Sequence, residues 1–144
     1  MKDIRSKGSE TIKDKLNEWN NTVSAYPKNS SVHSLIDERV LEFPEKIALR
    51  FEGETTTFKK FNETANQLAK LLLKENVQKG DVVGVAIDRS AEMVIALLAI
   101  LKSGAAYVPL DPEYPEERIE FMLEDSSAKI LLTSKKYKDH FHVP

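Results

Sequence analysis

The fold of this chain is decided by the stretch LKSGAAYVPLD, residues 101–111, which joins a helix end, a tight turn of small residues and a buried strand. The residues before the turn, 91–102, are apolar on nearly every side, which predicts a helix buried on most of its faces. Ser90 is placed to cap the start of this helix, and Glu92 lies in its first turn. Gly104 is placed to end it in a left-handed conformation, which residues with a Cβ adopt only at a cost.

The strand after the turn is short. Ala105 and Ala106 are small enough to let the helix and strand backbones approach closely. Tyr107 and Val108 then begin a strand that Pro109 limits, since proline has no N–H to donate to a neighbouring strand. By shape alone this pattern also fits the packing corner of any α/β protein, and such corners recur across unrelated functions.

Helices and a hairpin are predicted before this stretch. Residues 32–43 form one helix, which must end before Pro44 because the residue preceding proline avoids the helical region. Strands at 47–51 and 55–57 form a hairpin around Gly53. A second helix ends around residue 75, and its apolar face consists of Phe61, Ala65, Leu68, Ala69 and Leu72.

A parallel sheet is predicted from the strands that follow. Residues 82–87 are almost continuously apolar, which is typical of a strand buried on both faces of a parallel sheet. Pro115 is expected at the first position of a further helix, and residues 129–133 supply the next strand. That helix directs Ile119, Met122 and Leu123 inward. The order βαβαβ predicts an α/β fold with a mainly parallel sheet and helices on both faces.

Composition describes an ordinary globular chain. Its 144 residues are 41% hydrophobic and 31% charged, with a net charge of −2 that predicts no attraction to nucleic acid or to an anionic membrane. The chain has no cysteine, shows no signal-peptide pattern and lacks a run of roughly 20 apolar residues, so we expect a cytoplasmic protein. Residues 1–30 are polar and predict a linker with a helical stretch at 12–19, whereas 31–144 form the domain.

The stretch 101–111 resembles the second core motif of nonribosomal peptide synthetase adenylation domains, within the AMP-binding superfamily of adenylate-forming ligases. Ten of the eleven residues fit the motif Leu-Lys-Ala-Gly-x-Ala-Tyr-Val-Pro-Leu/Ile-Asp, and only Ser103 departs from it. This match favours the family over an unrelated packing corner. The motif residues are Leu101, Lys102, Gly104, Ala106, Tyr107, Val108, Pro109, Leu110 and Asp111.

A second resemblance lies at residues 56–61, which are similar to the family's first core motif, Leu-Thr-Tyr-x-Glu-Leu, through Thr57 and Phe58. In the family pattern, threonine caps a helix and glutamate reaches back to the cap residue's backbone amide. Thr57 can still cap, but Lys60 stands at the glutamate position and cannot accept that hydrogen bond. Residues 88–94 and 112–118 are also similar to peptide synthetases, and the likeness extends over about 16–133.

The resemblance implies the opening portion of a domain that uses ATP and Mg²⁺ to convert an amino acid to an aminoacyl adenylate. The parent would then load the acyl group onto the phosphopantetheine of a carrier domain. In this family the segment that leads into the adenylation domain often follows a condensation domain, and the sequence leaves open whether one precedes this chain. The family's Ser/Thr/Gly-rich loop ending in Pro-Lys-Gly is absent, and the segment 79–81 lacks the glycines that wrap a phosphate. No catalytic, cofactor-binding or metal-binding residue is therefore carried over, and we expect the isolated chain to be inactive.

Two alternatives remain open at this stage. The chain could be a noncatalytic interaction or split-partner protein, or a portion of a ligase that loads D-alanine or an aryl acid onto a carrier. An exposed apolar sheet edge or an unmatched core face would favour a portion of a larger domain. His140 and His142 make a poor metal site because no third ligand lies near them in sequence, and His33 is expected to make an ordinary local contact.

Overall fold

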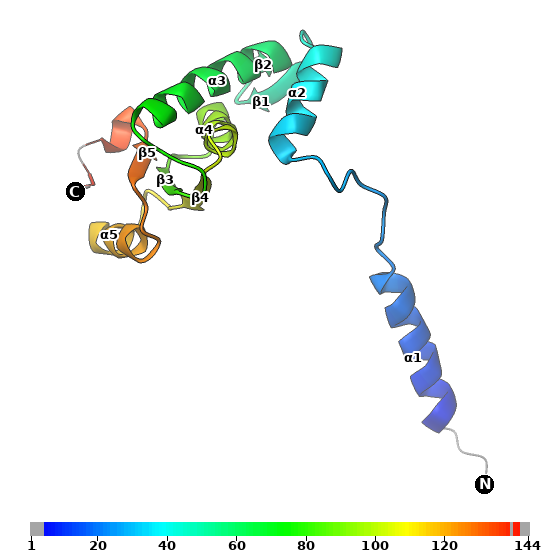
Figure 1. Cartoon of the computed structure of the whole chain (residues 1–144). Coiled ribbons are helices and arrows are strands. Elements are labelled where there is room, and N and C mark those ends of the chain that lie inside the picture. Colours follow the sequence, from blue (N-terminus) through cyan, green and yellow to red (C-terminus); the bar gives the residue numbers. More distant parts are fainter. Residues whose placement is uncertain (1–4, 139, 142–144) are drawn as a thin grey trace. The chain divides into compact units, whose positions relative to one another are not determined.

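The computed structural model describes residues 5–138, 140 and 141, and the chain divides into two compact units, residues 1–30 and 31–144. The first unit contains α1 (Arg5–Asn20), which is longer than the helical stretch predicted at 12–19, followed by residues without helix or strand (Figure 1). Three large apolar residues of α1 are exposed: Ile12, Leu16 and Trp19. Among the described residues, no helix has the length and apolarity needed to cross a membrane.

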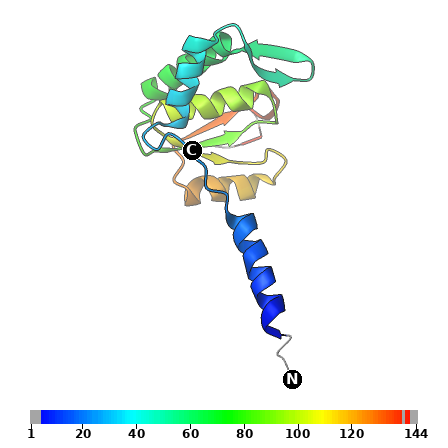
Figure 2. The same cartoon turned by 90° about the vertical axis from the view of Figure 1, so that its right-hand side faces the viewer.

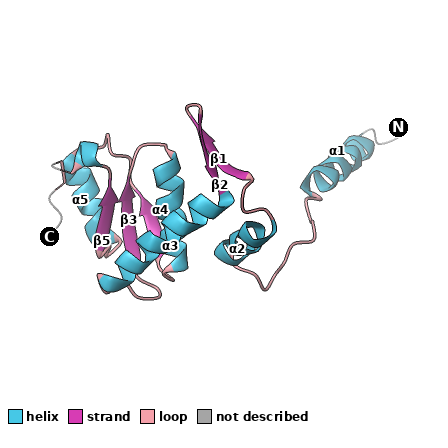
Figure 3. Cartoon of the chain, turned by 90° about the horizontal axis from the view of Figure 1, so that it is seen from above, coloured by secondary structure: helices cyan, strands magenta, loops and turns pink. Residues whose placement is uncertain are grey.

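The second unit contains two sheets. β1 and β2 form the predicted antiparallel hairpin, while β3, β4 and β5 form a parallel sheet in the order β4-β3-β5. The hairpin lies apart from the three-stranded sheet (Figure 3). The elements are α2 (Val32–Glu42), β1 (Ile47–Phe51), β2 (Glu54–Thr57), α3 (Phe58–Lys74), β3 (Val82–Ala86), α4 (Ala91–Lys102), β4 (Ala106–Pro109), α5 (Glu116–Asp125), β5 (Ile130–Thr133) and the 3₁₀ turn η1 (Lys135–Tyr137).

The parallel sheet lies between two helical layers, with α3 and α4 on one face and α5 on the other (Figure 2). The predicted α/β class, the βαβαβ order and the covering of both faces are confirmed. The central strand β3 is the most buried of the five strands, as its apolar sequence predicted. Gly84 in this strand is needed for packing, since a Cβ there would lie 2.6 Å from a Leu123 methyl carbon.

The predicted ends of α4 are confirmed. The Ser90 hydroxyl accepts a hydrogen bond from the Met93 N–H at 3.1 Å. At the other end Gly104 has φ +83°, its N–H donates to the Leu101 carbonyl, and the next N–H donates to the carbonyl of Ile100. These two bonds form a Schellman motif, which reverses the chain sharply toward β4. The departure from the motif at Ser103 leaves no unpaired hydroxyl, since its Oγ donates to the same Ile100 carbonyl at 2.7 Å.

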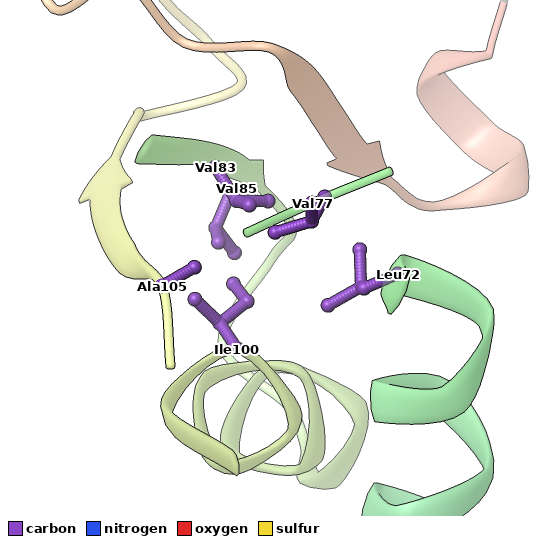
Figure 4. Packing of buried hydrophobic residues seen from close by; sticks show 6 residues of the cluster. All are labelled: Leu72, Val77, Val83, Val85, Ile100 and Ala105. Atoms are coloured by element: carbon purple, nitrogen blue, oxygen red, sulfur yellow. The ribbon is translucent and has the colours of Figure 1, made fainter. Parts of the chain in front are cut away.

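The core consists of three clusters of buried apolar side chains around the sheet and the helices. The first lies between β3, the end of α3 and α4, and comprises Leu72, Val77, Val83, Val85, Ile100 and Ala105 (Figure 4). The second joins α3 to α4 through Phe61, Ala65, Ala69, Leu98 and Ala99, whose small alanines let the two helices approach closely. The third lies on the α5 face and comprises Ala86, Leu110, Ile119 and Leu123. The predicted inward faces of α3 and α5 are therefore confirmed.

Two sequence-based expectations are wrong in detail. β4 is not a buried strand: it pairs only with β3, so it is an edge strand among the described residues, and Ala106, Tyr107 and Pro109 are exposed. Pro115 occupies the N-cap of α5 rather than its first helical position, because its ψ of 142° is extended. Its carbonyl already accepts from the N–H of Ile119, as a cap residue's carbonyl does.

The motif residue Lys102 ties α4 to α2. Its ammonium donates to the Asp37 carboxylate at 2.6 Å, and only 10% of the lysine side chain is exposed, compared with 45% of the aspartate. The lysine is thus a mostly buried cation whose charge is balanced by a residue far away in sequence. Removing the carboxylate alone would leave that cation without a partner, which costs more than removing the pair.

We therefore expect Asp37→Asn to lower the free energy of unfolding by about 1–2 kcal/mol. Lys102→Met keeps the apolar stem of the side chain and removes the charge, so the double variant should be more stable than Asp37→Asn alone. Urea denaturation of the three variants and the wild type measures this difference. Equal stability of Asp37→Asn and the wild type would show that the ion pair contributes nothing.

The N-terminus of α3 offers a second test. Thr57 caps the helix as predicted, because its Oγ1 accepts from the Lys60 N–H at 3.3 Å, and no acidic residue lies in the first turn. We expect Lys60→Glu to raise the free energy of unfolding by up to about 1 kcal/mol, through the helix dipole and the capping box. Lys59→Glu is the matched control, since it adds the same charge without the reciprocal bond and should gain less. A thermal melt in which Lys60→Glu gains nothing would refute this prediction.

Candidate functional site

The chain diverges at the carboxyl ends of β3 and β4. These strands are adjacent, yet the chain leaves β3 toward α4 on one face and leaves β4 toward α5 on the other (Figure 2). In open parallel sheets, this divergence creates a crevice at the carboxyl ends of the two strands. A hollow of about 420 Å³ lies there. Its lining is Ile87, Asp88, Arg89, Met93, Pro109, Leu110, Asp111, Pro112, Glu113, Tyr114, Arg118 and Met122.

The loop after β4 is held by its own contacts at the edge of this hollow. The Leu110 N–H donates to the Val85 carbonyl at 2.9 Å, which extends the pairing of β4 with β3 by one residue. The Asp111 carboxylate accepts from the Glu113 N–H at 3.0 Å. The guanidinium of Arg118 lies 4.0 Å from the centre of the Tyr114 ring, a cation–π contact between α5 and the loop. This contact places the Tyr114 ring in the wall of the hollow.

The core-motif residues do not gather in one place. Pro109, Leu110 and Asp111 lie at the hollow, whereas Lys102 and Gly104 lie at the opposite end of β4. Along the strand between them, Val108 packs against the α5-face cluster and Tyr107 is 40% exposed. Leu101 is half-buried in the last turn of α4, and Ala106 begins β4. Thr57 and Phe58 lie at the β2–α3 junction and do not line the hollow.

A polar network beside the hollow was not predicted. Asp88 follows β3, and its carboxylate accepts from the Tyr137 hydroxyl at 2.9 Å and from the Lys136 ammonium at 3.1 Å. The same ammonium donates to the Tyr137 hydroxyl at 2.6 Å. Tyr137 is buried, so the network fastens η1 to the β3–α4 connection. The sequence shows Lys136 only as part of a basic run, and no local signal pairs it with a residue about fifty positions earlier.

Electrostatics within the network favour the charged forms of Asp88 and Lys136. The hydrogen bond from Lys136, followed by that from Tyr137, lowers the pKa of Asp88 below its ordinary value of 3.8. Conversely, the hydrogen bonds with Tyr137 and Asp88 raise the pKa of Lys136 above its ordinary 10.5. At the other end of the sheet, the Gln78 N–H and then Lys129 lower the pKa of Asp81. Asp88 is therefore an ionised structural partner at neutral pH and is unsuited to hold a proton for catalysis.

The Lys79–Asp81 turn commits two of its amides to backbone hydrogen bonds. The N–H of Gly80 donates to the Gly104 carbonyl and that of Asp81 to the Gln78 carbonyl, so neither of these amides is free to bind a phosphate. No group of three or more His, Cys, Asp or Glu side chains that could hold a metal ion occurs among the described residues.

The structure describes two of the three histidines, and each makes a local contact. His33 lies 3.0 Å from the Ser31 hydroxyl, which is the ordinary local contact expected from the sequence. His140 packs edge-on against the Tyr137 ring at 5.7 Å between centroids. His142 lies outside the described residues. The site thus offers a shaped crevice that is lined in part by charged side chains.

The network generates a prediction about pH. The lowered pKa of Asp88 stabilises the fold above the ordinary value of 3.8, and this stabilisation is lost as the pH falls through the folded-state pKa. Because the bond from Lys136 is the largest cause, Lys136→Met should raise the Asp88 pKa more than Tyr137→Phe does. Carboxyl-carbon NMR titration of the wild type and the two variants measures this order. A wild-type Asp88 pKa at or above 3.8 would contradict the network.

Comparison with known proteins identifies the family. The family model described as AMP-binding enzyme matches residues 36–143. Among curated proteins, the chain is 42% identical over 133 residues to bacitracin synthase 1 of Bacillus licheniformis, covering 92% of this chain and 2% of that protein. It is 44% identical over 117 residues to tyrocidine synthase 1 of Brevibacillus parabrevis, covering 81% of this chain and 11% of that protein. The chain thus spans only a small part of the length of these relatives.

Solved structures also match most of the chain. The N-terminal subdomain of Klebsiella oxytoca NpsA in complex with 3-hydroxyanthranilyl-AMSN has a TM-score of 0.69 and 33% identity, covering 78% of this chain and 28% of that one. An artificially fused adenylation–PCP di-domain, NpsA-ThdA, has a TM-score of 0.67 and 34% identity, covering 72% of this chain and 20% of that one. The chain therefore belongs to the AMP-binding enzyme family, and it corresponds to the N-terminal part of an adenylation domain of the nonribosomal peptide synthetase kind.

Proposed function

We propose that this chain is the opening part of an adenylation domain that activates an amino acid for nonribosomal synthesis of a peptide antibiotic. The intact domain would join the amino acid carboxylate to ATP in the presence of Mg²⁺, forming an aminoacyl adenylate and releasing pyrophosphate. It would then transfer the acyl group to the phosphopantetheine thiol of a carrier domain. We place this activity in the cytoplasm, with a condensation domain preceding the linker of residues 1–30.

One observation carries the proposal: ten of the eleven residues at 101–111 fit the second core motif, and their strand ends at the hollow beside β3. The solved NpsA neighbours support it, because they are complexes with anthranilyl, hydroxybenzoyl and hydroxyanthranilyl AMSN compounds. The fused di-domain neighbour supports a carrier domain as the partner.

Within this domain the present chain would act as a support. Its motif residues hold the turn after α4, the edge strand β4 and the loop at the hollow. No group of three or more His, Cys, Asp or Glu side chains that could hold a metal ion occurs among its described residues. The parts that bind ATP and stabilise charge in the adenylation step must then come from elsewhere in the domain. We infer that the hollow and the network of Asp88, Lys136 and Tyr137 fix the surface on which those parts rest.

The choice of an amino acid over an aryl acid rests on the sequence relatives. The related peptide synthases are 39–48% identical to this chain, whereas the NpsA structures with aryl compounds are 33–34% identical. A ligase that loads D-alanine or an aryl acid shares the reaction and differs in the substrate pocket, which lies outside this sequence. The alternative of a finished noncatalytic protein predicts covered sheet edges. Among the described residues β4 and β5 each pair with β3 alone, and these unpaired edges favour a part of a larger domain.

We expect the isolated chain to show no amino-acid-dependent exchange of pyrophosphate into ATP, because it lacks the phosphate-binding loop. The assay uses radiolabelled pyrophosphate and a mixture of the common amino acids. The matched control is the longer protein made from the same reading frame, once the gene has been sequenced past the codon for Pro144. Sustained exchange by pure 144-residue protein would overturn the assignment of the catalytic groups to other segments.

Exchange by the longer protein would establish the activity and, with single amino acids, its substrate. A longer reading frame without the Ser/Thr/Gly-rich loop would overturn the proposed function, and so would a frame that stops. The noncatalytic interpretation would then replace it.

A further inference from the structure

A hollow of about 340 Å³ lies where three helices of the second unit meet. α2 contributes His33 and Asp37, which are four positions apart and therefore lie on the same face of the helix. α3 contributes Asn66 and Lys70 in the same way, and α4 contributes Lys102 from its last turn. We call this site the α2–α4 hollow. Its polar side chains come from segments far apart in the sequence, so they meet only in the folded unit.

Cations outnumber carboxylates in the lining of the α2–α4 hollow. Lys70 and Lys102 each contribute an ammonium group, whereas Asp37 contributes the one carboxylate of the lining. The hollow at the carboxyl ends of β3 and β4 has the opposite balance, with Asp88, Asp111 and Glu113 against Arg89 and Arg118. A concave surface with an excess of one charge raises the local concentration of ions of the other sign. The α2–α4 hollow therefore favours an anion.

The two partners of the ion pair in this hollow are held to different degrees. Only 10% of the Lys102 side chain is exposed, so its ammonium is confined to the hollow. The Asp37 side chain is 45% exposed, so its carboxylate loses little by turning toward water. A mostly buried ammonium group needs an anionic partner, but any anion of suitable size meets that need. Lys102 is thus a fixed cation whose counter-ion is exchangeable.

The second ammonium group decides the class of anion. Among the described residues, Lys70 lines the same hollow and forms no ion pair. A phosphate dianion carries two charges and several acceptor oxygens, so it can accept hydrogen bonds from two ammonium groups at once. The Asp37 carboxylate carries a single charge, and it accepts its hydrogen bond from Lys102. The side-chain amide of Asn66 adds N–H donors to the lining, so a phosphate-type oxyanion satisfies this hollow better than a carboxylate does.

We propose that the α2–α4 hollow binds a small oxyanion of the phosphate class, held by Lys70 and Lys102 while the Asp37 carboxylate turns toward solvent. This inference does not depend on the proposed function, because Lys102 and the hollow at Asp111 lie at opposite ends of β4. The contact between Lys102 and Asp37 ties α4 to α2. Binding replaces this link by a bound ion, so occupancy of the hollow weakens the hold of α4 on α2.

Titration with inorganic phosphate, followed by ¹H–¹⁵N NMR, tests the site in the 144-residue chain. The pH is one at which phosphate is a dianion, and sodium chloride keeps the ionic strength constant and screens weak surface attraction. Two charge-assisted hydrogen bonds to a partly exposed anion correspond to a dissociation constant on the order of 1 mM. We expect the largest amide shifts at residues 33–37, 66–70 and 102. Sodium acetate supplies a carboxylate instead and should bind at least about fivefold more weakly, whereas equal binding would contradict the phosphate class.

Two pairs of variants separate the hollow from general surface charge. Lys70→Gln should weaken phosphate binding by at least about fivefold, whereas Lys74→Gln, which removes the same charge one turn later on α3, should change it less than about twofold. Asp37→Asn should tighten binding by at least about threefold, since it removes the competing carboxylate. Glu38→Gln, which removes the same charge from the next residue of α2, should change it less than about twofold. Lys74 and Glu38 are exposed and do not line the hollow.

Three further results would overturn the inference. One is equal phosphate binding by Lys70→Gln and the wild type, and another is a failure of Asp37→Asn to bind more tightly than Glu38→Gln. The third is a set of shifts spread over exposed lysines without saturation, which indicates an adventitious ion only. Lys70→Gln leaves the pair of Lys102 and Asp37 intact, so its result stands even if Asp37→Asn is too unstable to titrate. Pyrophosphate exchange by the longer protein tests the proposed function separately, and neither outcome of that assay alters this one.

Discussion

The second unit depends on a backbone contact between two glycine turns. The N–H of Gly80 donates to the Gly104 carbonyl at 3.0 Å, and the next strand begins with the Ala106 N–H donating to the Asp81 carbonyl at 2.8 Å. Both glycines have positive φ, which residues with a Cβ adopt only at a cost. Together these bonds set the register of β4 against β3. Because the two strands start level, their carboxyl ends also meet, and the hollow lined by Asp88 and Asp111 forms there.

The backbone contact between Gly80 and Gly104 also shows that the core motif has a structural role. The motif ends a buried helix, reverses the chain and delivers Leu110 to the cluster under α5 within eleven residues. Each of its parts acts at a different place: Lys102 balances Asp37 of α2, while Asp111 folds the loop beside the hollow. The motif residues therefore contribute to packing and to loop structure at several places in the second unit.

Much of the fold could be predicted from local patterns. The caps at Ser90 and Gly104 were predictable because capping depends on neighbouring residues alone, and the buried strand β3 was predictable from its continuous apolar run. The exposure of β4 was not, because an edge strand differs from an interior strand only by the neighbour it lacks. The network of Asp88 with Tyr137 was not predictable either, since its partners are brought together only when β3 and β5 pair. The location of the hollow required the strand order, which local periodicity does not contain.

The proline at the β4 edge has a consequence for the nascent chain. β4 is synthesised before β5, so for an interval it is an edge strand in a partly folded chain. Unpaired strand edges of partly folded chains can pair with other chains and aggregate. An edge that ends in Pro109 offers an incomplete ladder to a foreign strand and so resists intermolecular β-pairing. The β5 edge, which contains no proline, forms only when residues 130–133 are made. Order of synthesis and edge chemistry would thus act together to limit intermolecular β-pairing while the chain is being made.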